Sequence, residues 1–170
     1  MRITHVPKLL LMKVLLGTVL LFVLLNIWNS KSDPDWHKSL PPCPCKNPDL
    51  SGVQLNDGWA KDQGDIATYH KGAAECFRSY PYIETSAGNS GQQCCYDRTG
   101  SLIQSGSGAG TPDKVSTCAG EDKNGVMKVR TFALLSHYFK DVKPWKNSGE
   151  PDVAWKVYNQ GWPPSQVNCD

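Results

Sequence analysis

The hydrophobic pattern divides the chain into one continuous apolar segment near the N-terminus and a long body in which apolar residues are sparse. Residues 9–28 contain a single charged residue, Lys13, among mostly Leu, Val and other apolar side chains. At about 1.5 Å of rise per residue, a helix of this length matches the roughly 30 Å hydrocarbon core of a bilayer. The pattern therefore predicts a signal-anchor or transmembrane helix over 9–28, with residues 1–8 as a short cytosolic segment before it.

The charges that flank this segment predict its orientation. Arg2 and Lys8 precede it, and no acidic residue occurs before Asp33. Because the basic flank stays in the cytosol, the chain beyond residue 30 is expected outside, in an extracellular or lumenal position. The end of the segment carries Asn and Trp where a signal peptidase requires small residues, which favours a single-pass anchor. Secretion after cleavage is the alternative.

Strand-like patterns occur in the middle of the body. Residues 29–42 are polar and end in two prolines, as is typical of a stalk. Residues 75–80 are expected to form a strand. Residues 92–104 predict a β-hairpin with a four-residue turn over 97–100, in which Gly100 takes the position of positive φ.

Helical periodicity appears only in the last third of the chain. Residues 127–142 place apolar side chains on two adjoining helical stripes, which predicts the helix that buries most apolar surface. Pro144 is expected to end it, because the residue before a proline is disfavoured in the α region. A second, short helix is predicted over 151–159. The Gly- and Ser-rich residues 105–110 predict a mobile loop.

The charge balance of the body excludes one class of partner. From residue 31 onward the chain has 15 Lys and Arg against 16 Asp and Glu, so the basic pI of about 8.1 comes from the N-terminal segment. Nucleic-acid binding needs a clustered basic face. No nucleic-acid partner is therefore expected.

Seven cysteines follow the apolar segment: Cys43, Cys45, Cys76, Cys94, Cys95, Cys118 and Cys169. In an exported chain with few periodic apolar residues, they predict disulfides that compensate for a small core. Cys94 and Cys95 point to opposite faces of a strand and are expected to have different partners. Because the number is odd, at least one thiol stays free or joins another chain. The expected fold over 43–170 is a small disulfide-rich α+β domain, with a short antiparallel hairpin or sheet packed on one main helix.

One pair of polar residues on the predicted helix invites a chemical interpretation. His137 and Asp141 are four residues apart and share a helix face, so they could form an acid–base pair or offer two metal ligands. The alternative is a stabilising hydrogen bond, or an Asp141 side chain that caps a neighbouring turn. With no nucleophile or third ligand at a recognisable spacing, no catalytic, cofactor-binding or metal-binding residue is assigned. Three carboxylates lack the spacing of an EF-hand and are expected to be solvated: Asp57, Asp62 and Asp65.

Several sequence blocks occur in the order found in a known extracellular domain. They are LPPCPC at 40–45, YHKGAAECFRS at 69–79, GQQCCYD at 91–97, GSL at 100–102, GTPDKV at 110–115, His137, DVKPW at 141–145 and PPSQVNC at 163–169. This ordered set resembles the AMOP domain, the adhesion-associated module of mucin 4, sushi-domain-containing protein 2 and isthmin. The resemblance extends over residues 36–169. The cysteines differ from the family pattern. Family members carry further cysteines in the regions that correspond to 52–75 and 146–160, where this chain has none, and Cys118 has no counterpart in the family.

The resemblance implies a stand-alone, non-catalytic interaction module at the cell surface, with an unknown extracellular protein as partner. It also implies that His137 and Asp141 are a structural signature of the family. Two rival functions are kept. One is a small secreted hydrolase or metal-dependent enzyme that uses His70, His137 and Asp141. The other is a structural surface component that forms a homodimer through the odd cysteine.

Overall fold

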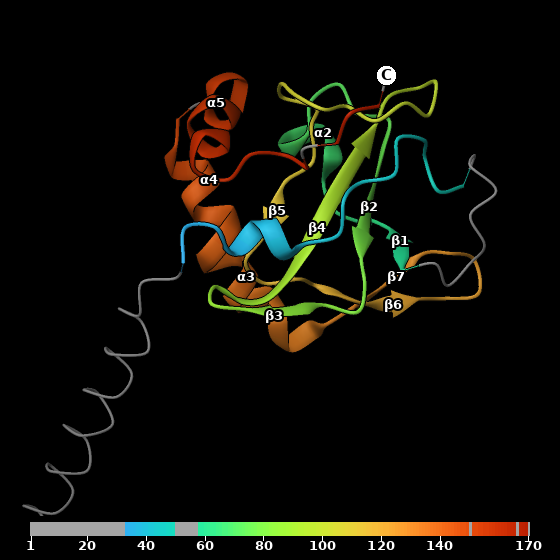
Figure 1. Ribbon diagram of the computed structural model, residues 1–170, viewed down its shortest axis with the longest axis horizontal. Coiled ribbons are helices and arrows are strands. Elements are labelled where there is room, and N and C mark those ends of the chain that lie inside the picture. Colours follow the sequence, from blue (N-terminus) through green and yellow to red (C-terminus); the bar gives the residue numbers. More distant parts are fainter. Residues whose placement is uncertain (1–32, 50–57, 150, 166, 170) are drawn as a thin grey trace, which may run out of the picture. The chain divides into compact units, whose positions relative to one another are not determined.

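The computed structural model (Figure 1) describes residues 33–49, 58–149, 151–165 and 167–169. The predicted cytosolic segment, the predicted anchor and the first residues of the predicted stalk lie outside these ranges. Across the part of the chain that is described, no helix has both the length and the apolar character needed to cross a bilayer.

The domain is built on an antiparallel sheet centred on one long strand, β4 (Figure 1). The sheet order is β1 (Trp59–Lys61), β2 (Glu75–Ser79), β4 (Gly88–Tyr96) and β3 (Ile83–Thr85), with β5 (Pro112–Asp113) also paired to β4. Strands β6 (Cys118–Glu121) and β7 (Met127–Val129) form a separate antiparallel pair. The expectation of a small disulfide-rich α+β domain with an antiparallel sheet is confirmed.

The helical segments are mostly short. They are the 3-10 turns η1 (Trp36–Ser39) and η2 (Thr131–Ala133), the α-helices α2 (Ile66–Tyr69), α3 (Leu134–His137), α4 (Lys143–Asn147) and α5 (Pro151–Gly161), and the π-helical turn η3 (Tyr138–Val142). In Figure 1, α3, α4 and α5 gather on one side of the sheet. The predicted second helix is confirmed as α5 and runs two residues further than expected.

Both predicted strand regions are present, with different bounds. Strand β4 begins at Gly88, before the predicted start at residue 92. Strand β2 ends one residue before the predicted end. The hairpin turn is present, and Gly100 has a φ of 73°, which an L side chain rarely adopts. The second arm is shorter than predicted, because Ser101 and Leu102 make only isolated bridges, to Lys46 and Tyr96 respectively.

The prediction of one helix over 127–142 is wrong at its start. Residues 127–129 form β7, in which Val129 lies opposite Cys118 of β6. Pairing with a neighbouring strand supplies the backbone hydrogen bonds that a first helical turn would otherwise have provided. A tertiary contact has therefore overridden the helical periodicity.

The expected end of this helix at Pro144 is also wrong. The backbone stays helical through α4, and Lys143, which precedes the proline, has φ −65° and ψ −44°. Proline has no N–H to donate to the preceding turn. The wide π-helical turn η3 directly before it changes the hydrogen-bonding register, so the helix can continue past Pro144.

The predicted burial of this helix is the third correction. Phe132 is 101% exposed and Leu135 is 68% exposed, and the aromatic side chains of η3 are also exposed. The core is instead divided into four small clusters, one of which joins Phe77 and Tyr96 to Cys43 and Cys94. Among the residues that the structure describes, no single large apolar cluster is present for the helix to cover.

Six cysteines form three disulfides, Cys43–Cys94, Cys45–Cys169 and Cys76–Cys95. Cys94 and Cys95 thus have different partners, as their positions on opposite faces of β4 require. Cys76 and Cys95 lie directly opposite each other in the register of β2 and β4. Cys118 is the remaining thiol, and it is buried and free.

The residues just before Cys43 do not form a free stalk over their described part. Trp36 of η1 and Leu40 are buried and pack with Ala87, next to Ile83 and Trp162. These apolar side chains belong to the domain core. The folded domain therefore begins before the predicted boundary at residue 43.

Candidate functional site

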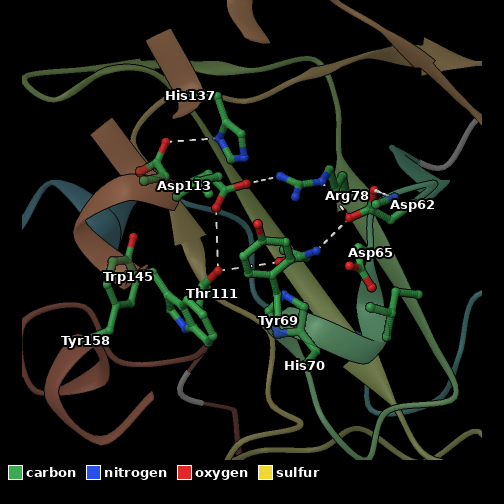
Figure 2. Close-up of a pocket in the computed structure, with 15 residues that line it drawn as sticks. Asp62, Asp65, Tyr69, His70, Arg78, Thr111, Asp113, His137, Trp145 and Tyr158 are labelled. Carbon is green, nitrogen blue, oxygen red and sulfur yellow. Dashed lines mark hydrogen bonds and ion pairs between the residues drawn. The ribbon is translucent and has the colours of Figure 1, made fainter. Parts of the chain in front are cut away.

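A pocket of about 130 Å³ lies between the sheet and the helices (Figure 2). One wall comes from the residues around α2 and from the strands β2, β4 and β5, and the other from η3, α4 and α5. Its lining includes both histidines of the rival enzyme hypothesis, His70 and His137, together with Asp141.

Arg78 connects two carboxylates in the wall of this pocket. Its Nε donates to Asp62 Oδ2 at 2.7 Å, and its Nη1 donates to Asp113 Oδ2. Gln93, which lies opposite Arg78 in the register of β2 and β4, donates its Nε2 to the same Asp62 oxygen at 2.6 Å. All of these side chains are buried, so the fold keeps one cation and two anions away from solvent together.

The electrostatics of Asp62 reflect this arrangement. Burial would raise the pKa of the carboxyl group, but the Arg78 charge and the hydrogen bonds from Gly64, Arg78 and Gln93 outweigh burial and lower the pKa. The expectation that Asp62 is a solvated loop carboxylate is therefore wrong. Asp65 is exposed and caps α2 by accepting from the Thr68 backbone N–H. Asp57 lies outside the described residues.

Asp141 links η3 by hydrogen bonds to the backbone that follows β5. Its Oδ1 accepts from the Lys114 N–H at 2.8 Å, and its Oδ2 accepts from the Val115 N–H at 3.1 Å. His137 Nδ1 lies 3.0 Å from the Val115 carbonyl oxygen and 3.1 Å from Asp141 Oδ2. Both atoms are acceptors, so Nδ1 carries the proton. The geometry favours the capping interpretation of Asp141.

Asp113, His137 and Asp141 each offer a ligand atom to a metal ion, and these atoms lie within 4.8 Å of one another. Asp113, however, holds the Arg78 guanidinium, and both oxygens of Asp141 accept backbone N–H groups. A site in which the carboxylates already have protein donors and a cation beside them gains little from a metal ion. The donor set therefore fits a structural role, and no metal is assigned to it.

His70 attaches a loop to the pocket. Its Nδ1 lies 2.8 Å from the Ala109 carbonyl oxygen, and the imidazole is buried. Burial lowers the pKa of His70, which keeps the ring neutral. The loop at 105–110, expected to be mobile, is packed here, since a Cβ on Gly110 would overlap the Gln93 carbonyl oxygen. The close approach of this backbone to Gln93, rather than a need for flexibility, explains why a glycine occupies position 110.

The two histidines share a pocket, and both make hydrogen bonds to the backbone. Each Nδ1 is held on a backbone carbonyl oxygen. The Thr111 hydroxyl donates to Gln93 Oε1 and to Asp113 Oδ1. Among the described residues, no hydrogen bond joins an imidazole to a hydroxyl or thiol side chain. A nucleophile with an adjacent base is therefore absent from the described pocket.

Sequence reasoning did not single out four of the pocket residues: Arg78, Gln93, Thr111 and Asp113. Each of them lies in a sequence block that carried the family resemblance, CFRS, GQQCCYD or GTPDKV. Membership of these blocks was thus the available sequence signal for the pocket residues, although the blocks contain no evident chemical motif. Their polar residues are the ones that meet in the pocket.

Comparison with known proteins identifies a family for this chain. The sequence profile of the AMOP domain matches residues 26–169. The human protein "Sushi domain-containing protein 2" is 40% identical over 127 residues, which covers 68% of this chain and 14% of the relative. The chain therefore spans about one seventh of the length of this curated relative. No solved structure matches.

The described part of the chain is thus a small α+β domain held by three disulfides, with a buried polar network in its pocket. The match over most of its length shows that the chain belongs to the AMOP domain family. AMOP domains are disulfide-rich, adhesion-associated extracellular modules. The three disulfides of this chain agree with an oxidising, extracellular location.

Proposed function

We propose that this protein is a non-catalytic binding module at the cell surface, which contacts a partner protein through the exposed side of η2, α3 and η3. We call this surface the helical apolar face. Its members are Phe132, Leu134, Leu135, Tyr138 and Phe139, all of which are exposed. Their exposure is the observation that carries the proposal. Several large apolar side chains exposed along one short stretch of chain are typical of an interaction site, whereas single exposed apolar residues are common.

The charges around this face indicate the chemistry of the partner. Residues 123–149 contain six Lys and Arg, and their one acidic residue, Asp141, is buried. The Lys143 Nζ lies 5.5 Å from the Phe139 ring centroid, and the Lys146 Nζ lies 5.9 Å from that of Tyr138. A protein surface with an apolar centre and an acidic rim complements such a face.

The rival functions have less support. The pocket lacks a nucleophile paired with a base among the described residues, which disfavours a hydrolase. Cys118 is 1% exposed, so a disulfide to a second chain would first require local unfolding. A surface contact needs no such opening.

We further propose that residues 9–28 anchor the protein as a single-pass helix, with residues 1–8 in the cytosol and the domain outside. The apolar length of the segment and the oxidised cysteines support this topology. Protease treatment of intact cells is expected to remove the domain and to leave the N-terminus protected. A domain that is digested only after permeabilisation would contradict the orientation.

The proposed face is tested by photocrosslinking on cells that display the full chain. A benzoylphenylalanine is placed at Phe132 or at Leu135, and at the exposed Arg98 in the hairpin turn as a matched control. We expect a discrete crosslinked protein from the two helical positions and none from position 98. This product should be lost when Lys140→Glu and Lys143→Glu reverse the charge beside the face. Equal crosslinking at all three positions, or none, would contradict the proposal.

The double variant Phe132→Ser/Leu135→Ser separates binding from folding. Both side chains are largely in solvent, so the free energy of unfolding is expected to change by no more than about 0.5 kcal/mol. Crosslinking from a benzoylphenylalanine placed at Lys128 or in η3 is expected to be lost. Chemical denaturation measures the first quantity. A large loss of stability would show that these residues support the fold rather than a contact.

A further inference from the structure

Arg130 is fixed in place where β7 leads into η2. Its backbone N–H donates to the Thr117 carbonyl oxygen at 2.8 Å, and its side-chain Nη1 donates to the Ser116 carbonyl oxygen at 2.9 Å. The Ala133 N–H in turn donates to the Arg130 carbonyl oxygen at 2.9 Å, so the backbone is held on both sides. The guanidinium group therefore lacks much of the rotamer freedom that a long surface side chain ordinarily has.

The guanidinium group also lies over an aromatic ring. Its central carbon is 4.2 Å from the ring centroid of Tyr82, which directly precedes β3 and is 36% exposed. Such a contact uses the face of the guanidinium group and leaves the N–H groups at its edge able to donate. Tyr82 thus positions Arg130 without taking up its hydrogen-bond donors.

The positive charge of Arg130 is not paired within the described part of the chain. The ion pairs found there involve other cations, and the exposed carboxylate of Glu84, two residues after Tyr82, is not joined to Arg130. Ser116 accepts from one N–H group of the guanidinium, and the described residues supply no acceptor for the others. Arg130 is partly exposed, so an acceptor from solvent can reach it.

Exposed aromatic side chains lie next to this positioned charge. Phe132, two residues further along the chain, is 101% exposed, and Tyr82 contacts the guanidinium group itself. Arginine and aromatic residues are the types that contribute most to binding at protein interfaces. A carboxylate whose own neighbours in the partner chain are apolar complements this combination of charge and apolar surface.

We propose that Arg130 binds the side-chain carboxylate of an Asp or Glu of the partner protein, with apolar residues on either side of that acid packed on Tyr82 and Phe132. The inference rests on the proposed function, because Phe132 belongs to the helical apolar face. The carboxylate oxygens accept from guanidinium N–H groups that the fold leaves without an acceptor. Since Tyr82 and Ser116 already position the side chain, little of its conformational freedom remains to be lost on binding.

The test titrates the full chain, held in nanodiscs, with the capped tripeptide acetyl-Leu-Glu-Leu-amide. The readout is the side-chain Nε–H signal of Arg130 in ¹⁵N–¹H spectra, identified by its loss in Arg130→Lys. The same tripeptide with Gln or Lys at its centre is the neutral or cationic comparison probe, and acetyl-Leu-Leu with a free carboxylate represents a chain terminus. We expect a saturable shift with the Glu tripeptide, and binding of the other three probes that is weaker by at least about fivefold.

Two variants examine the assigned contacts, with the backbone N–H signal of Phe132 as the readout. Arg130→Lys keeps the charge but loses the fork of donors, so the dissociation constant for the Glu tripeptide should rise about three- to tenfold. Tyr82→Leu removes the ring that positions the guanidinium group and should raise it about two- to fivefold. Arg98→Lys, at an exposed arginine in the hairpin turn, is the matched control and should change nothing.

Three results would overturn the inference: no saturable shift with the Glu tripeptide, equal affinity for the Glu and Gln tripeptides, or an unchanged dissociation constant in Arg130→Lys. Equally tight binding of the free chain terminus would overturn the assignment to a side-chain carboxylate. Circular dichroism of each variant verifies that a lost signal does not arise from unfolding.

These failures are distinguishable from failure of the proposed function. If the tripeptide does not bind but photocrosslinking from Leu135 still gives a discrete product, only the acidic contact at Arg130 is wrong. If the crosslinked product is absent, the helical apolar face itself is wrong, whatever the tripeptide does.

Discussion

Arg78 is the residue on which the pocket depends most. Its guanidinium group lies between Asp62, which follows β1, and Asp113 of β5, and the side chains of all three are nearly inaccessible to solvent. The fork of donors on an arginine suits two carboxylates approaching from different directions, which a lysine ammonium would satisfy less well. The pocket wall thus needs this residue type at this place.

Replacement of Arg78 by Met is expected to lower the free energy of unfolding by about 3–5 kcal/mol, because two buried carboxylates lose their counter-charge. Urea denaturation at neutral pH measures the change. Arg98→Met, at an exposed turn position, is the matched control and should stay within about 0.5 kcal/mol of the original protein. A loss at Arg78 as small as that of the control would contradict a structural ion network.

At the scale of elements, the loop at 105–110 and the segment 127–147 differ most from their sequence patterns. A Gly- and Ser-rich composition indicates backbone freedom, but here the glycine permits close contact with β4. Helical periodicity indicates an amphipathic helix, but it does not say what covers the apolar side. In this domain nothing among the described residues covers Phe132.

The contact between His70 and the loop has a pH signature. The pKa of folded His70 lies below the ordinary 6.5, so on acidification the unfolded chain binds the proton before the folded protein does. The original protein should therefore lose stability as pH falls from 6.5 toward the folded pKa. His70→Gln should cost about 1–3 kcal/mol near pH 7.5, through the lost contact with Ala109, and should lack this part of the acid dependence.

Denaturation of both proteins at pH 7.5 and pH 5.5 measures this difference. The gap in stability between them is expected to narrow at the lower pH. A gap that stays constant or widens would mean that folded His70 takes up a proton as readily as the unfolded chain.

At the scale of the whole molecule, covalent links take the place of a large core. The four apolar clusters are small, and the disulfides connect distant parts: Cys45–Cys169 spans 124 residues and Cys76–Cys95 spans 19. Removing a link enlarges the set of conformations open to the unfolded chain, and the effect grows with loop length.

Cys45→Ser/Cys169→Ser should therefore destabilise the domain more than Cys76→Ser/Cys95→Ser. The chain-entropy relation gives about 5 kcal/mol for the first pair and about 3 kcal/mol for the second. Guanidinium denaturation without reductant measures both. Cys118→Ala, which removes no link, is the comparison variant. The reverse order for the two pairs would contradict an entropic origin.

The prediction from sequence succeeded where the signal is local. The strand at 75–79, the turn at Gly100 and the helix α5 follow from neighbouring residues, and the cysteines with the sequence blocks predicted a disulfide-rich AMOP domain. The hydrogen bond between His137 and Asp141, one of the interpretations left open, is also local, because the two residues are four positions apart.

Contacts between distant residues were decided by the tertiary structure alone. Arg78 meets Asp62 and Asp113 across 16 and 35 positions, a pairing that no periodicity encodes. The same holds for the choice of cysteine partners and for the solvent exposure of Phe132. Turns, helix caps and the alternation of apolar and polar residues along a strand arise from interactions between neighbours along the chain. Burial and charge pairing depend instead on which segments the fold brings together.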